Sequence, residues 1–196
     1  MILPLHDLAG FYHDPGVSYA VIAFFLYSFL GWVMECIVIR REKGVWENRG
    51  FAHSPFCVIY GVGAMLGVVI LRPFAHNLLM LYLAGALIAT LFEYATGVLM
   101  LRLFGELWWD YKEKPFNYKG ILCLESTLGW GLIAVLLFTF LHRIVTGAVR
   151  VIPAEYAPFL ALALMLGYLF DFLLSTRAAL RRKEEEDPVS EIVFRQ

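Results

Sequence analysis

Charged residues are scarce in this sequence. They make up 17% of its 196 residues, against about 25% in an ordinary soluble domain. The formal net charge is −1, so the chain has no basic excess of the kind that binds nucleic acid. Hydrophobic residues make up 60% of the chain. We therefore predict an integral membrane protein whose main surroundings are the lipid bilayer, with no nucleic-acid partner.

Three further absences exclude other classes. No GxxxxGK[ST] loop is present, so the chain cannot hydrolyse ATP by itself, and we expect no cofactor. The first 18 residues contain no Lys or Arg, which argues against a cleavable signal peptide. Three cysteines, an odd number, argue against a disulfide framework.

Long apolar segments dominate what remains. A helix needs about 20 mostly apolar residues to cross the hydrocarbon core. Five segments meet or approach this length, and the second and fifth are the shortest. They are residues 17–39, 55–71, 78–101, 121–141 and 159–175. The predicted fold is therefore all-α, a single polytopic transmembrane bundle over residues 1–180 with a solvated cytoplasmic tail at 181–196.

Lys and Arg predict the orientation of this bundle. With five spans, the first loop, the third loop and the C-terminal tail lie on one side. Thirteen of the 16 Lys and Arg residues fall there, and only three fall on the other side. Because basic residues gather on the cytoplasmic side, the N-terminus is expected outside and the C-terminus in the cytoplasm. We expect the bacterial inner membrane.

The two long inner loops resemble each other in outline. Each follows a span with one glutamate, Glu35 or Glu93, and each contains tryptophan. Each then passes through a glycine into a span with closely spaced glycines. This pattern favours two parallel helical hairpins related by an axis along the membrane normal, plus a fifth helix.

Acidic residues inside the spans are the first candidates for function. An acid at the centre of a transmembrane helix costs about 2.5–3.5 kcal/mol, and such residues usually face the bundle interior. All four lie toward the predicted cytoplasmic ends of their helices: Glu35, Glu93, Glu125 and Asp171. One interpretation is structural pairing with Arg40, Arg49 or Arg102. The other is a polar cavity that opens to the cytoplasm.

The inner loops supply further candidates. Tryptophan and tyrosine at headgroup level are ordinary membrane anchors, which does not account for the other polar residues there. Those residues would form a lid over the acids or bind a lipid headgroup. The candidates are Asn48, Arg49, His53 and Tyr60 after the first span, and Trp109, Asp110 and Asn117 after the third.

A metal site and a nucleophilic serine are two further alternatives for the residues near the predicted inner interface. Three cysteines and one histidine, Cys36, Cys57, Cys123 and His53, lie near the predicted inner interface. A Cys₃His zinc site is chemically reasonable, but the chain has no paired CxxC spacing. No elbow motif surrounds the neighbouring Ser54 and His53. We assign neither a metal site nor a catalytic residue.

Three segments resemble a known family. They are NRGFAHSPFCVIYGVGA (residues 48–64), LFEYATG (91–97) and WWDYKEKPFN (108–117). Over about residues 25–130 the sequence is similar to the bacterial CmpB-type family, catalogued as a putative ABC-transporter permease of type IV. The resemblance implies a permease that needs a separate ATPase subunit, with residues 102–120 as the loop for docking it. The fifth span, with Asp171, is expected to lie outside the shared core.

Three hypotheses follow. The favoured one is a permease-like transport subunit that forms a homo-oligomer, because five helices enclose little volume. The second is a small membrane enzyme or binding protein that acts on a lipid headgroup through Arg49, His53 and Asp110. The third is a structural assembly factor. Transport is favoured over catalysis mainly because of the family resemblance.

Overall fold

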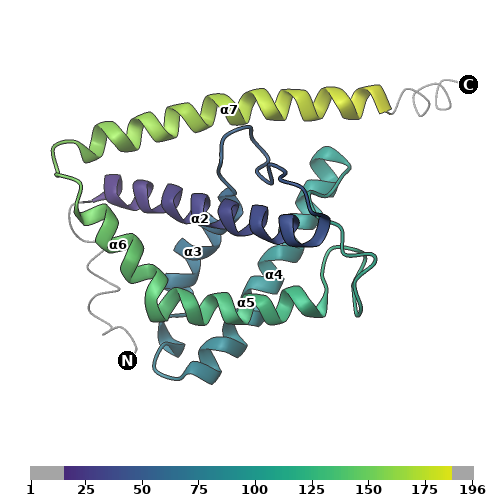
Figure 1. Cartoon of the computed structure of the whole chain (residues 1–196). Coiled ribbons are helices and arrows are strands. Elements are labelled where there is room, and N and C mark those ends of the chain that lie inside the picture. Colours follow the sequence, from purple (N-terminus) through teal and green to yellow (C-terminus); the bar gives the residue numbers. More distant parts are fainter. Residues whose placement is uncertain (1–15, 187–196) are drawn as a thin grey trace, which may run out of the picture.

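A computed structural model describes residues 16–186 of the chain (Figure 1). All the regular elements in this part are helices, and an isolated bridge between Tyr118 and Leu122 is the sole extended pairing there. In chain order they are α2 (Val17–Lys43), α3 (Val58–Ile70), η1 (Arg72–Phe74), α4 (Leu78–Phe104), α5 (Leu124–Leu136), η2 (Leu137–Leu141), α6 (His142–Arg150) and α7 (Ala157–Glu186). The predicted all-α class is confirmed.

Four helical segments in the described part are long and apolar enough to cross a membrane. They are Val17–Arg41, Leu78–Phe104, Leu124–Arg150 and Ala157–Arg181. The second predicted span, residues 55–71, contains only the 13-residue helix α3. At about 1.5 Å per residue, α3 is roughly 20 Å long, which is shorter than the hydrocarbon core of about 30 Å. The chain is a multi-pass membrane protein with four long apolar helices and the shorter apolar helix α3, in line with the prediction of about five spans.

The fourth and fifth spans are longer than predicted. The fourth continues through η2, a π-helical segment, into α6, so the expected outer loop is helical as far as Arg150. The first proline after the start of α5 is Pro153, and helices commonly end just before a proline. Helix α7 continues to Glu186, so residues 181–186 of the expected tail are helical. The rest of that tail lies outside the described residues.

Glycines bring the helices together in pairs. Helices α2 and α3 form one hairpin, and α4 and α5 form the other, with the most extensive contacts of any helix pairs. A Cβ atom added at Gly31 would lie 2.3 Å from the Tyr60 ring, and one added at Gly85 would lie 2.2 Å from the Cβ of Ala134. Because small residues allow helix backbones to approach closely, these positions define the hairpin interfaces. The pairing agrees with the prediction, and the symmetry axis remains a prediction.

The first loop, the third loop and the second half of α7 share one end of the bundle. The ring of Phe51, in the first loop, lies 4.7 Å from the Trp108 ring of the third loop and 5.2 Å from the Phe172 ring of α7. In Figure 1 the loop after α2 extends up to α7, which runs alongside α2. The basic loops that the sequence assigned to one side are therefore together in space.

Candidate functional site

Glu93, on α4, is a buried carboxylate with three neutral donors. Its side chain is only 3% exposed. Its Oε1 accepts a hydrogen bond from the Tyr111 hydroxyl at 3.1 Å. Its Oε2 accepts bonds from the Ser126 hydroxyl at 3.2 Å and from Nε1 of Trp130 at 2.9 Å. These donors come from the third loop and from α5, so Glu93 ties that hairpin together.

Tyr111 is held as a donor by its surroundings. It lies in the third loop, outside the spans, and its burial raises the pKa of the phenol. The nearby Glu93 and Glu35 carboxylates raise this pKa further, because they disfavour a second negative charge. Tyr111 therefore remains protonated over the physiological range.

No basic side chain of residues 16–186 lies within ion-pair distance of Glu93; each of its polar contacts is with a neutral donor. A buried carboxylate without a countercharge is costly. Three hydrogen bonds offset part of that cost. Binding a proton or a cation would remove the remainder.

Glu35, on α2, is a second carboxylate close by. Its Oε1 accepts a hydrogen bond from the Tyr60 hydroxyl of α3. Its Oε2 lies 3.9 Å from Nε of Arg49, whose Nη2 also donates to the Trp108 carbonyl at 2.7 Å. Arg49 therefore connects Glu35 to both the first and the third loop.

Two aromatic rings join the carboxylates. The rings of Tyr60 and Trp130 lie 5.6 Å apart, and each of these residues donates a hydrogen bond to one of the acids. The result is a chain of contacts from Glu35 through Tyr60 and Trp130 to Glu93. We call this chain, with Arg49, Tyr111 and Ser126, the polar network. It crosses from one hairpin to the other.

Asp171, on α7, makes a separate set of contacts. Its Oδ1 accepts hydrogen bonds from the His53 amide at 3.3 Å and lies 3.0 Å from Nδ1 of the same residue. Its Oδ2 accepts a bond from the Ser54 amide at 2.6 Å. The Ser175 hydroxyl lies 3.2 Å from Nδ1 of His53. Asp171 thus binds the first loop and not the polar network.

Asn48 organises that first loop. Its Oδ1 accepts hydrogen bonds from Nε1 of Trp32 at 2.7 Å and from the Gly50 amide at 3.0 Å. Its Nδ2 donates to the carbonyls of Ala52 and His53. The loop is therefore a defined structure, anchored to α2 by Trp32.

The other candidates lie outside the polar network. Trp109 donates to the Ile121 carbonyl at 2.8 Å, and Asn117 donates to two carbonyls of the third loop, so both shape that loop. Asp110 is exposed and forms an ion pair with Lys112. The Glu125 side chain is 70% exposed and lies 3.0 Å from Nζ of Lys114. Arg40 and Arg102 do not pair with the four acids in the described part of the chain.

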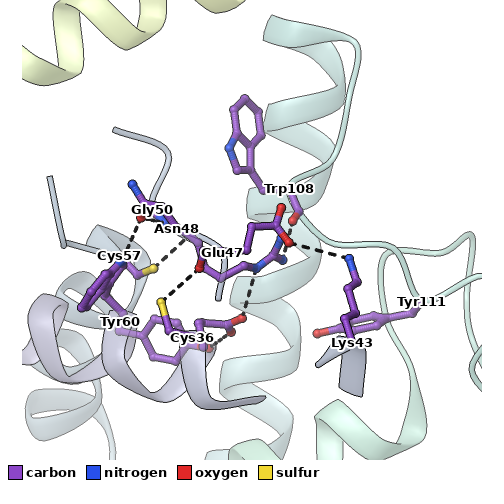
Figure 2. Close-up of polar contacts among 12 residues, drawn as sticks. Cys36, Lys43, Glu47, Asn48, Gly50, Cys57, Tyr60, Trp108 and Tyr111 are labelled. Carbon is purple, nitrogen blue, oxygen red and sulfur yellow. Dashed lines mark hydrogen bonds and ion pairs between the residues drawn. The ribbon is translucent and has the colours of Figure 1, made fainter. Parts of the chain in front are cut away.

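The three thiols are buried and contact the backbone. Cys36 donates to the Glu47 carbonyl at 3.3 Å and Cys57 to the Arg49 carbonyl at 3.4 Å. Figure 2 shows both cysteines, with Tyr60, next to the loop residues. The Cys123 sulfur accepts from the Ser126 amide at the start of α5. Over residues 16–186, no three His, Cys, Asp or Glu side chains are grouped to hold a metal ion.

Three members of the polar network were absent from the sequence candidates. Ser126 and Trp130 are four residues apart on α5, so they lie on one face of that helix. The four-residue spacing of these two side chains, on a helix that also carries closely spaced glycines, was the signal in the sequence that could have identified them. Tyr111 follows two tryptophans in the third loop, and it was grouped with the interfacial aromatic residues.

A family model described as "Putative ABC-transporter type IV" matches residues 22–176. The chain belongs to this family. The match reaches Asp171, so the shared region extends beyond the fourth span, contrary to expectation. No curated protein and no solved structure matches the chain. The family description fits an ABC-transporter-type membrane protein with several apolar helices.

Proposed function

We propose that this member of the family is a permease-like subunit of a transporter. Its polar network binds a proton, a small cation or the cationic group of a polar substrate at the cytoplasmic end of the bundle. The observation that supports this most directly is the state of Glu93, a buried carboxylate with three neutral donors and no countercharge among the described residues. Glu35 supplies a second carboxylate across the contact between Tyr60 and Trp130.

The proposal requires partners. The sequence has no nucleotide-binding loop, so the energy for pumping comes from a separate ATPase subunit. Five helices leave little internal volume, which favours a homo-dimer around the transport path. The lipid bilayer surrounds the remaining apolar faces.

Native mass spectrometry of the protein in a mild detergent tests these partners. We expect a homo-dimer, a co-purifying ATPase, or both. A monomer that retains one defined phospholipid would overturn the permease proposal. That result would favour headgroup binding or chemistry at the inner leaflet, with the exposed His53 as the first residue to test.

The Glu93→Gln variant tests the role of the buried carboxylate. It keeps the size and most hydrogen bonds of the side chain but removes the charge. We expect transport to fall at least about tenfold, equivalent to about 1.4 kcal/mol of lost stabilisation. The measurement is proton, Na⁺ and K⁺ flux in proteoliposomes that contain the co-purified complex. Glu125→Gln is the matched control, because its carboxylate is exposed at the rim, and it should retain wild-type flux. Wild-type flux in Glu93→Gln would refute the assignment.

The orientation can be tested separately. Because the basic loops lie together at one end of the bundle and basic loops face the cytoplasm, a C-terminal fusion to green fluorescent protein should fluoresce. A C-terminal fusion to alkaline phosphatase should be inactive. Activity of the phosphatase fusion would reverse the proposed orientation and place the polar network at the outer end.

A further inference from the structure

The loop between α2 and α3 packs against the polar network as a folded unit. Residues 44–56, which we call the lid, begin at Gly44, where α2 ends in the left-handed conformation (φ 74°) with open space around it. The hydrogen bonds of Asn48 fix the internal shape of the lid.

The underside of the lid contacts the Glu35 region. Arg49 of the lid lies against the Glu35 carboxylate. The carbonyls of Glu47 and Arg49 accept hydrogen bonds from the thiols of Cys36 and Cys57, respectively. These thiols are 4% and 7% exposed, so the lid covers them, whereas the Glu35 side chain beside them is 29% exposed. Figure 2 shows the two cysteines beside the lid residues that they contact.

The upper side of the lid is fastened to α7 by Asp171. This carboxylate accepts hydrogen bonds from the backbone amides of His53 and Ser54 and contacts the His53 ring. Both of these residues belong to the lid. The rings of Phe51 and Phe56 pack on Phe172 and Tyr168 of α7. The His53 side chain is 79% exposed, so this fastening lies at the edge of the lid next to water.

Helix α7 has a small packing interface with the rest of the described protein. It is the least buried of the four long spans. Among the described helices it packs mainly against α2, with few contacts to α4. A small displacement of α7 would therefore separate Asp171 from the lid without disrupting either hairpin. Local openings of this kind need far less free energy than global unfolding.

We propose that the lid is a gate over the Glu35 side of the polar network and that Asp171 is the latch that keeps it closed. Movement of α7 away from α2 releases the latch, and the lid then turns about Gly44 to uncover the two thiols beneath it and to widen access to Glu35, which is partly exposed in the closed state. The gate controls access to the proposed transport site, so its purpose rests on the proposed function. Its mechanics rest only on the contacts described above.

The native cysteines report on the gate. The purified protein is treated with N-ethylmaleimide for increasing times, and modification of each thiol is measured by peptide mass spectrometry. In Asp171→Asn the amide cannot accept both backbone donors as the carboxylate does, so we expect Cys36 and Cys57 to react at least about tenfold faster. Cys123, equally buried but in the other hairpin, should change by less than about twofold. Asp110→Asn, an exposed acid in the neighbouring loop, should leave all three rates unchanged.

His53→Ala provides a second variant that keeps the fold, because this side chain is exposed. It removes the imidazole contact but keeps the Ser54 amide, so the same two thiols should react faster by a smaller factor. Unchanged rates in Asp171→Asn would overturn the latch, and equal acceleration of all three thiols would show general loosening and overturn the lid. Labelling needs no transport. Loss of the proposed function in the flux assay, with selective labelling intact, would leave the gate standing.

Discussion

We expect Glu93→Ala to destabilise the protein far more than Glu93→Gln. Alanine removes the acceptor shared by Tyr111, Ser126 and Trp130. Ser126 also bonds the Cys123 carbonyl, so it keeps a partner. The other two donors lose theirs, at about 1–3 kcal/mol for each unsatisfied buried group. Glutamine retains an acceptor oxygen for Trp130. The free energy of unfolding, measured by SDS titration in mixed micelles, should therefore be similar for wild type and Glu93→Gln. For Glu93→Ala it should be lower by about 2–6 kcal/mol.

A double-mutant cycle isolates the cause. Trp130→Phe removes the indole donor while keeping an aromatic ring against Tyr60. In the wild-type background this change leaves Glu93 with one fewer donor. In Glu93→Ala it removes a donor that has no acceptor, so it should cost less there, by about 0.5–3 kcal/mol. Additive effects would show that the bond between Trp130 and Glu93 contributes little to folding.

Much of the fold could be predicted because the bilayer imposes a simple rule. Apolar runs must form helices, since no water in the hydrocarbon core can satisfy the backbone. The helix of the fourth predicted span continues past the expected end at residue 141, as far as Arg150. In the structure His142 is buried, and its Nδ1 lies 2.6 Å from the Tyr27 hydroxyl of α2. That partner is 115 residues away, and local sequence gives no sign of it.

The candidate site shows the same limit. Sequence identified the acids, because ionisable residues are conspicuous inside apolar runs. It treated Glu93, Glu125 and Asp171 alike, although they occupy three different environments. Glu93 is buried in the polar network, Glu125 pairs with Lys114 at the rim, and Asp171 binds the lid. Helix periodicity gives the face of a residue within its own helix but not the neighbour that this face meets. The donors that define each acid come from other elements.

Gly85→Ala should have an effect on helix packing out of proportion to one methyl group. The new Cβ would lie 2.2 Å from the Cβ of Ala134 on α5. Both atoms are attached directly to backbone, so no rotamer change relieves the clash and α4 and α5 must move apart. Overpacking of this kind costs about 1–3 kcal/mol. The polar network also crosses the same pair of helices, so the bond between Glu93 and Trp130 should weaken. SDS unfolding measures the first effect, and flux in proteoliposomes measures the second.

The compensating swap distinguishes steric clash from other causes. Gly85→Ala combined with Ala134→Gly moves the methyl group from one helix to the other and restores the space. The double variant should recover most of the lost stability, because it has one glycine and one alanine at these two helical positions, as wild type has, so the helix propensities cancel. Gly129→Ala is the matched control on α5, because a Cβ there meets nothing within 4 Å. It should be neutral or slightly stabilising. If the swap fails to rescue while Gly129→Ala is silent, the close contact of α4 and α5 at Gly85 is not what holds this hairpin together.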